Sequence, residues 1–299
     1  MAAKTLDAAG SGTRALQRVL HHYVRAARRC LTEATASDET VHRARKALKK
    51  SRTALRLLRP ALSKSCFQRA NRSLRDTAHV LNALRDARVL IEALAKLRRE
   101  VPALRTNSAA ATLAARLQQE LSAARRRLNA RTLQDDCRTL RREERRAGQL
   151  PVGRHGWSVL GPAMRHIYRQ GRRVLPAASG HPADEALHEW RKRVKDLRYA
   201  LKIFAPIQPR ALGALEKQAT AIAEQLGDAH DLALLHARTA SLEARSGPGR
   251  RRLLQAIEAA RMQRALAALV AGERLFQPRP GDFERQLGRA WRSWRHRRS

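Results

Sequence analysis

The sequence predicts an all-α protein of 299 residues, built as two antiparallel four-helix bundles related by a pseudo-two-fold axis. Alanine and leucine dominate its apolar residues, whereas residues that favour strands are few. Helical patterns alternate with short segments that contain glycine and proline. In addition, a twenty-residue segment occurs twice, at 41–60 and 187–206, which indicates an internal duplication.

The first half covers residues 13–147 and follows a loose leader of residues 1–12. Helices are expected in it over about 13–33, 39–59, 63–99 and 107–147. The second of these has a typical start, because Ser37 or Asp38 can cap its N-terminus. It ends at Pro60, since proline disrupts the helical hydrogen bonding. The third expected helix is long enough to be bent.

The second half is separated from the first by a glycine-rich segment. Residues 148–161 hold four glycines and one proline, which makes them the clearest boundary in the chain. We place a linker at 148–157 and the second half at 158–298. Its helices are expected over about 158–175, 183–205, 209–245 and 250–273, with a short C-terminal helix after them.

The repeated segment aligns without a gap at an offset of 146 residues. Eight of the twenty aligned pairs are identical, and five of these eight are a histidine and four cations. The five pairs are His42/His188, Arg45/Arg191, Lys46/Lys192, Lys49/Lys195 and Arg52/Arg198. A helical core explains repeated leucine and alanine, but it does not explain cations at a repeated spacing. A duplicated basic surface is therefore the first candidate for a functional site.

The cations of each copy share one helix face, opposite the apolar residues, when successive residues are placed 100° apart. We call these faces the first and the second stripe. The first stripe contains His42, Arg45, Lys46, Lys49, Arg52 and Arg56, and the second contains His188, Arg191, Lys192, Lys195, Arg198 and Lys202. Glu189 and Asp196 project off the second stripe, so we expect no partner within the helix to neutralise it. Repulsion one turn apart costs a few tenths of a kcal/mol per pair, which favours an anion-binding face over an ordinary solvated one.

The two histidines have two possible roles. His42 and His188 both lie in the first turn of their helices, beside the cations. Each could donate a hydrogen bond to an anion and gain a proton on binding. Each could instead pack against a neighbour or cap the end of a bundle.

Charge and composition limit the classes of partner. The chain has 62 Lys plus Arg against 26 Asp plus Glu, a formal net charge of +36. Such a charge attracts nucleic acid, polyphosphate and acidic membrane surfaces, whereas only 4% aromatic residues argue against base stacking. The N-terminus has no apolar core of the signal-peptide type, and no uncharged stretch approaches the ~18 residues that span a bilayer. We therefore expect a soluble cytoplasmic protein without a membrane partner.

The stripes resemble the signature of a known family. The pattern His-x-x-Arg-Lys-x-x-Lys-x-x-Arg, which begins at His42 and again at His188, is similar to that of CHAD domains, the conserved histidine α-helical domains. The resemblance covers roughly residues 13–298. Because the pattern occurs twice and in the order that the family has, it is more specific than a single copy.

A second pair of segments supports the resemblance. LNALRDARVL at 81–90 and LGDAHDLALL at 226–235 resemble the family's Leu-Gly-x-x-Arg/Asn-Asp element. Asp86 and Asp231 match its aspartate, whereas Asn82 stands in the first copy where the family has glycine.

The resemblance implies a basic central cavity or groove lined by the two signature helices. It also implies non-catalytic binding of inorganic polyphosphate and association with polyphosphate granules. Polyphosphate has about one charge per phosphate and no bases, so a row of arginines and lysines suits it. Neighbouring helices offer further candidate residues: Arg18, His22, Arg25, Arg165, Arg169, Arg172 and Arg173.

An enzyme is the first alternative. The sequence contains no P-loop, no His-Glu-x-x-His and no Gly-x-Ser-x-Gly motif. Asp228, Asp231 and His236 do not converge on one side of a helix as metal ligands would, and the stripes lack the carboxylates that hold Mg²⁺ in phosphoryl transfer. We therefore expect no catalytic activity, no metal and no other cofactor.

A general polyanion-binding or nucleic-acid-binding protein is the stronger alternative, because a chain of this charge binds DNA or RNA at low salt. No helix-turn-helix pattern indicates that a base sequence is read. The C-terminal helix with Trp291 and Trp294 could contact such a partner together with Arg297 and Arg298, or it could pack as an ordinary terminal helix. These patterns leave the oligomeric state open.

Overall fold

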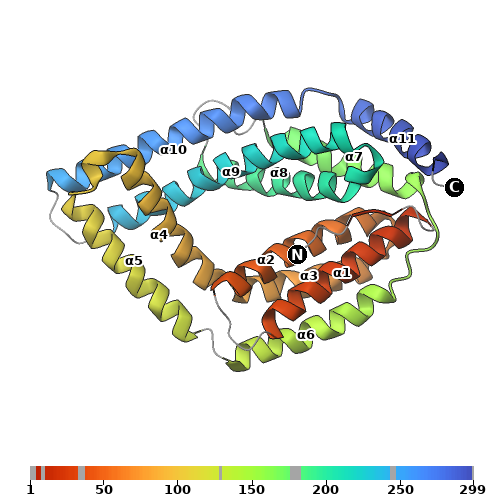
Figure 1. Ribbon diagram of the computed structural model, residues 1–299, viewed down its shortest axis with the longest axis horizontal. Helices are drawn as coiled ribbons and strands as arrows, with labels where there is room; N and C mark the ends of the chain where they lie inside the picture. Colours follow the sequence, from red (N-terminus) through yellow and green to blue (C-terminus); the bar gives the residue numbers. More distant parts are fainter. Residues whose placement is uncertain are drawn as a thin grey trace.

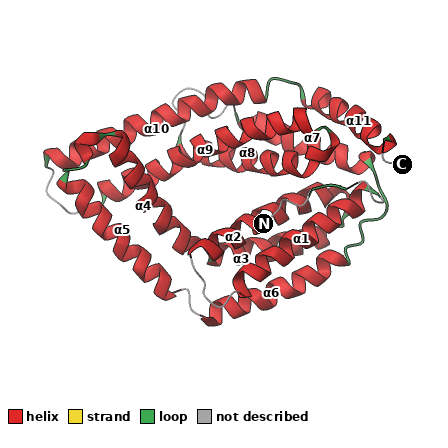
Figure 2. Cartoon of the chain, viewed as in Figure 1, coloured by secondary structure: helices red, strands yellow, loops and turns green. Residues whose placement is uncertain are grey.

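The computed structural model describes residues 5–7, 11–32, 38–127, 130–175, 183–242 and 247–297, and only the backbone of residues 38, 82–85 and 130. Eleven α-helices and a few short 3-10 turns form the regular structure of these residues, and no strand occurs among them (Figure 2). The all-α prediction is thereby confirmed. No helix in the described part of the chain combines the length and the apolar character that crossing a membrane requires.

Six helices lie in the first half and five in the second, within the described residues. The first six are α1 (Gly12–Thr32), α2 (Asp38–Leu58), α3 (Lys64–Val80), α4 (Asn82–Glu100), α5 (Ser108–Arg127) and α6 (Ala130–Gly148). The other five are α7 (Trp157–Val174), α8 (Asp184–Phe204), α9 (Pro209–Ala240), α10 (Pro248–Leu275) and α11 (Pro280–His296). The signature helices α2 and α8 both end in a short 3-10 turn that contains the repeated proline, Pro60 or Pro206.

Two of the expected long helices are each divided in two. The helix expected over 63–99 consists of α3 and α4, which meet at Leu81. The side chain of Leu81 is completely buried, and its backbone leaves the helical region at ψ 3°. Burial of this residue thus stabilises a bend where the sequence has neither glycine nor proline. The helix expected over 107–147 likewise consists of α5 and α6.

The helices form three packed groups (Figure 1). Helices α1, α2, α3 and α6 form one group, and α7 to α10 form a second, with α11 against α7. Helices α4 and α5 pack with the far ends of α9 and α10, and this third group differs from the expected pair of four-helix bundles. It exists because α9 and α10, with 32 and 28 residues, extend beyond the second group. At 1.5 Å per residue, α9 is about 48 Å long.

The buried core extends through the first two groups, and a second cluster fills the third. Trp190 of α8 is the largest completely buried side chain, and Gly272 of α10 lies against its indole, where a Cβ would collide with the ring. Trp291 and Trp294 are also buried, so the C-terminal helix packs as an ordinary terminal helix. Within the expected leader, Leu6 is buried and its N–H donates to the carbonyl of Ile203 at 2.9 Å.

The core determines which way the stripes face. Leu48 and Leu55 of α2 are completely buried, as are Leu197 and Leu201 of α8. Because these leucines occupy the helix faces opposite the cations, both stripes lie on the sides of α2 and α8 that point away from the hydrophobic core.

Candidate functional site

The two stripes line one cavity. Helices α2 and α8 contact each other, and a cavity of about 320 Å³ lies beside both of them. We call it the central cavity. Its basic lining consists of His42, Arg45, Lys46 and Lys49 from the first stripe and Arg191, Lys195 and Arg198 from the second. Residues 146 positions apart in the sequence therefore converge on the same space.

Helix α9 supplies the remaining wall, and that wall is partly acidic. Glu224, Asp228 and Asp231 line the cavity next to Ala223 and Gly227. Asp228 is neutralised from α4, because its Oδ2 accepts a hydrogen bond from Nζ of Lys96 at 2.5 Å. Within the described part of the chain, no three His, Cys, Asp or Glu side chains come together in a way that could hold a metal ion.

Two buried arginines occupy equivalent positions on the cavity floor. Arg45 and Arg191 are each only 7% exposed. Nη1 of Arg45 donates to the carbonyl of Ala78 at 3.1 Å. Arg191 packs beneath α9, where a Cβ on Gly227 would lie 3.2 Å from its Nη2. The glycine of the second motif thus makes room for the arginine of the first, and burial holds both guanidinium groups in fixed positions.

Arg52 and Arg198 are a second equivalent pair, with partners that differ in charge. Nε of Arg52 donates to Oδ1 of Asn71 at 3.2 Å, whereas Nε of Arg198 approaches Oε1 of Glu216 at 3.4 Å. The partners are 145 residues apart, as are the two copies of the second motif. The contact is therefore duplicated, but only the second copy partly neutralises its arginine.

The stripes are not free of acidic partners, which corrects the expectation from helical spacing. Lys192 forms an ion pair with Glu189 on the same helix, at 3.1 Å. Nη1 of Arg56 donates to Oδ1 of Asp196 at 2.6 Å, although the two residues belong to different copies. Side chains of this length reach acids that a helical projection places off the stripe.

The two histidines differ in their surroundings. His42 is exposed and lines the central cavity. His188 does not belong to that lining; its ring lies on the ring of His230, with centroids 4.4 Å apart. Burial lowers the pKa of His188, and the charges of Lys192 and Arg191 lower it further. His42 thus has the surroundings expected of an anion ligand, and His188 those of a packing residue.

The candidates on α1 have acidic or aromatic neighbours of their own. Arg18 pairs with Asp7, and Nε of Arg25 lies 3.9 Å from Oε1 of Glu144 on α6. His22 stacks edge-on against Tyr23, with ring centroids 5.3 Å apart. None of these three candidates is among the residues that line the central cavity.

The candidates on α7 also have local contacts. Arg165 lies 3.5 Å from Glu284 of α11, and Nη1 of Arg172 donates to the carbonyl of Pro278 at 2.6 Å. Arg169 contacts His166, and Arg173 donates to Gln170. The lining of the central cavity includes none of them, so their part in an anion site stays a prediction.

Two residues beside the site were not predicted from the sequence. Tyr199 of α8 lines the central cavity. Lys50 of α2 is half-buried, with its Nζ 4.9 Å from the ring centroid of Tyr23. Burial and the charges of Lys46, Lys202 and Arg198 lower the pKa of Lys50 to about 8. Both residues occupy repeat positions where the copies differ, so identity between the copies gives no signal for them.

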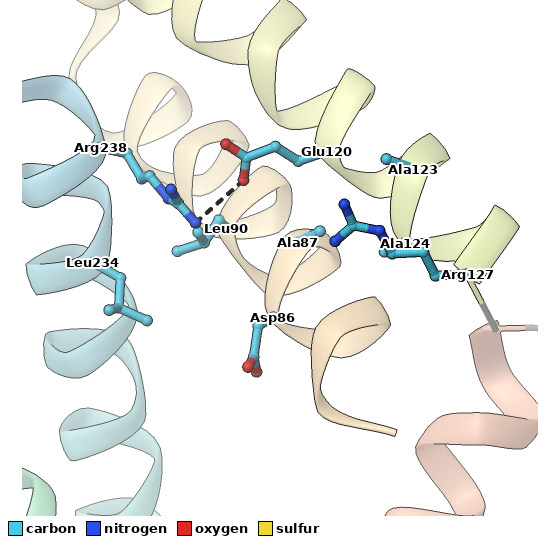
Figure 3. Close-up of a pocket in the computed structure, with 9 residues that line it drawn as sticks. All are labelled: Asp86, Ala87, Leu90, Glu120, Ala123, Ala124, Arg127, Leu234 and Arg238. Atoms are coloured by element: carbon cyan, nitrogen blue, oxygen red, sulfur yellow. Dashed lines mark ion pairs between the residues drawn. The ribbon is translucent and has the colours of Figure 1, made fainter. Parts of the chain in front are cut away.

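A further cavity of about 490 Å³ lies in the third group, between α4, α5 and α9. Arg238 forms an ion pair with Glu120 across it at 3.4 Å, and Ala87, Leu90 and Leu234 supply apolar surface (Figure 3). Asp86 of the second motif also belongs to its lining. The charges here are balanced, with two arginines and two acids, whereas seven residues of the basic stripes line the central cavity. The central cavity is therefore the stronger candidate for binding a polyanion.

Comparison with known proteins identifies a matching family and similar solved structures. The family model described as the CHAD domain matches residues 14–240. Among solved structures, PptA from Streptomyces chartreusis is similar with a TM-score of 0.66 at 18% identity, over 90% of this chain and 100% of its own. The CHAD domain from the plant Ricinus communis has a TM-score of 0.63 at 20% identity, over 92% of this chain and 95% of its own. At these identities the two structures support the fold. No curated protein matches the sequence.

Proposed function

The chain belongs to the CHAD domain family, and from that premise we propose that it binds inorganic polyphosphate, without catalysis, in the central cavity between α2 and α8. The family is associated with polyphosphate binding. The observation that carries the proposal for this chain is the convergence of both stripes on one cavity, since seven of their residues line it. A linear chain of phosphates in that cavity would meet cations from both copies.

The chemistry of the lining suits a chain of phosphates. Arg45, Arg191 and Arg198 offer planar guanidinium groups that can bind two phosphate oxygens at once. Lys46, Lys49 and Lys195 offer compact charges on flexible stems, which can follow phosphates that are not fixed in place. The rigid arginines would fix part of the ligand, and the lysines would accommodate the rest.

Nucleic acid is the second candidate, because a net charge of +36 attracts any polyanion. The cavity favours polyphosphate over nucleic acid in two respects. Its volume of about 320 Å³ suits a narrow chain better than a duplex. Its aromatic lining residue, Tyr199, is only 8% exposed, which leaves little ring surface for stacking a base.

A competition experiment tests the choice of ligand. Labelled long-chain polyphosphate is bound to the protein at about 150 mM salt, where weak electrostatic binding is largely screened. DNA, RNA and short phosphates, matched by total charge, are then added. Retention of polyphosphate against a large excess of nucleic acid supports the proposal. Displacement in proportion to phosphate content would make the protein a general polyanion binder.

We further propose that polyphosphate binding directs the protein to polyphosphate granules. A fluorescent fusion should form foci in cells that contain polyphosphate and should lose them in cells that cannot make it. Foci that follow the nucleoid in both kinds of cell would instead favour the nucleic-acid alternative.

A further inference from the structure

The signature helices carry opposite charges at one position that faces the opposite copy. Lys50 of α2 corresponds to Asp196 of α8, at the offset of 146 that relates the whole repeat. The cations around these two residues are equivalent in the repeat: Arg198 and Lys202 near Lys50, and Arg52 and Arg56 near Asp196. Lys50 and Asp196 thus have equivalent cationic neighbours, although their own charges are opposite.

The end of the interface at Asp196 is neutralised within the protein. The Asp196 carboxylate accepts a hydrogen bond from Arg56 at 2.6 Å, and its side chain is only 15% exposed. Burial raises the pKa of this carboxyl, and the charges of Arg56, Arg193 and Arg52 lower it. Arg193 also forms an ion pair with Glu189 at 2.5 Å. The three arginines at this end therefore share two acids, Asp196 and Glu189, which leaves little uncompensated charge for a ligand.

The end of the interface at Lys50 has the opposite character. Lys46 and Lys50 of α2 lie close to Arg198 and Lys202 of α8. None of the three lysines forms an ion pair with a carboxylate in the described part of the chain. The acid that faces the cluster is Glu216 of α9, which contacts Arg198 at 3.4 Å. The charges that act on Lys50 are therefore three cations, Lys46, Lys202 and Arg198, and one acid, Glu216.

This cluster adjoins the central cavity, because Lys46 and Arg198 belong to both. We infer that Lys46, Lys50, Arg198 and Lys202 form a phosphate subsite that extends the cavity at one end only, so that a polyanion leaves the cavity past Lys50 and not past Asp196. This inference rests on the proposed function. The duplicated site is then directional. The carboxylate of Asp196 occupies one end, and the end at Lys50 binds the ligand.

Proton uptake on binding is the expected signature of this subsite. Lys50 faces Lys46 on its own helix, Arg198 and Lys202 on α8, Glu216 on α9 and the ring of Tyr23 on α1. With its pKa at about 8, Lys50 is mostly charged at pH 7 and mostly neutral at pH 8.5. Bound phosphates stabilise the charged form and raise this pKa. Lys50 should then take up most of a proton on binding at pH 8.5 and little at pH 7.

The experiment uses the full chain, long-chain polyphosphate and the substitution Lys50→Gln. Calorimetric titrations in two buffers of different ionisation enthalpy measure affinity and proton uptake at pH 7.0 and pH 8.5. Lys50→Gln should weaken binding at pH 7.0 about 5- to 10-fold, the effect of losing one charge-assisted contact, and should abolish the uptake at pH 8.5. The matched control is Lys64→Gln on α3, an exposed lysine outside the cavity lining, which should change neither.

A second pair of substitutions tests the direction of the site. Arg56 and Lys202 are equivalent in the repeat, and Lys202→Gln should weaken binding several-fold more than Arg56→Gln does. Equal losses would overturn the one-ended site, as would unchanged uptake in Lys50→Gln. Either result leaves the proposed function standing if the unaltered protein binds tightly. If the unaltered protein binds no polyphosphate at about 150 mM salt, the proposed function itself fails.

Discussion

Arg56 of α2 and Asp196 of α8 form an ion pair of 2.6 Å that joins the two copies of the repeat. Both side chains are largely buried, at 26% and 15% exposure. Removing one member of a buried pair leaves the other charge without compensation, which typically costs 3–5 kcal/mol. The contact therefore stabilises the packing of signature helix α2 against signature helix α8.

Reversal of cavity charges should weaken binding far beyond the effect of net charge. The variant carries Lys46→Glu, Lys49→Glu and Lys195→Glu, three cavity residues that are at least partly exposed, so the fold should survive. Three lost charge-assisted contacts predict a loss of affinity of at least about 100-fold. Fluorescence anisotropy with labelled polyphosphate at about 150 mM salt measures it.

The control for this variant reverses three exposed arginines of α6, Arg131, Arg141 and Arg142. Its net charge changes by the same amount, and its affinity should fall by less than about 3-fold, as screened surface charges predict. Equal losses in the two variants would show a diffuse charge effect and would refute the assignment of the site to the stripes.

Gly227→Ala should separate stability from binding. Alanine favours a helix interior by up to about 1 kcal/mol over glycine, so the thermal midpoint should not fall. Its Cβ would lie 3.2 Å from Nη2 of Arg191, however, and must displace that guanidinium group. We expect affinity for polyphosphate to fall about 3- to 10-fold, as the loss of one well-placed contact predicts.

Gly213→Ala on the same helix is the matched control. A Cβ at this position meets no atom within 4 Å. It should bring the same gain in helix stability with unchanged affinity. If Gly227→Ala binds like the parent while both variants gain stability, then the placement of Arg191 does not matter for the ligand.

The two histidines should respond differently to pH. His42→Ala should weaken binding more at pH 6 than at pH 8, because an exposed histidine beside bound phosphates gains its proton as the pH falls. Since the pKa of His188 is lowered in the fold, the neutral ring on His230 stabilises the native state, and that contribution is lost as the pH falls below about 6.5. His188→Phe should therefore reduce the loss of thermal stability between pH 7 and pH 5. An unchanged loss would refute this role for His188.

Asp136→Asn should stabilise the protein at neutral pH. Asp136 of α6 is 8% exposed, and its buried Oδ2 has no hydrogen-bond partner in the described part of the chain. Burial, aided by the charge of Asp135, raises its pKa to about 6. Below its pKa in the unfolded chain, the carboxyl is neutral in both states and does not lower the stability. Above pH 6 it is charged in both states, and the fold is destabilised because the charge is buried there but hydrated in the unfolded chain.

The gain from Asp136→Asn should thus grow between about pH 4 and pH 6 and level off at about 2–3 kcal/mol. Urea unfolding at pH 4 and pH 7 measures the difference. A gain of the same size at both values would contradict an ionised, buried Asp136, and so would no gain at pH 7.

Local sequence patterns could predict the signature helices but not all of their contacts. The spacing of Leu48 and Leu55 determines the buried face of α2, and the cations necessarily lie on the other. The length of the helix expected over 63–99 indicated a bend, but the position of the bend at Leu81 had no local signal, because a buried leucine marks no helix end. Arg18, Arg25 and Arg165 are exposed, yet their acidic neighbours come from other segments, which a helical projection does not show.

Lys50 shows a second limit of prediction from the sequence. It lies about 80° from His42 in projection, at the edge of the first stripe. Its copy at 196 is an acid, so the repeat gave no identical pair there. The signal for Lys50 and Asp196 is instead the inversion of charge between the two copies.

The packing of Gly272 against Trp190 limits where the protein can be truncated. The matched region ends at residue 240, before α10 begins at Pro248. Trp190 lies in the first half of signature helix α8, and Gly272 of α10 packs against its indole. A chain truncated at residue 240 would expose the largest buried side chain beside the cations that are meant to bind the ligand. The segment that matches the family is therefore shorter than the segment needed to keep Trp190 buried, which includes α10.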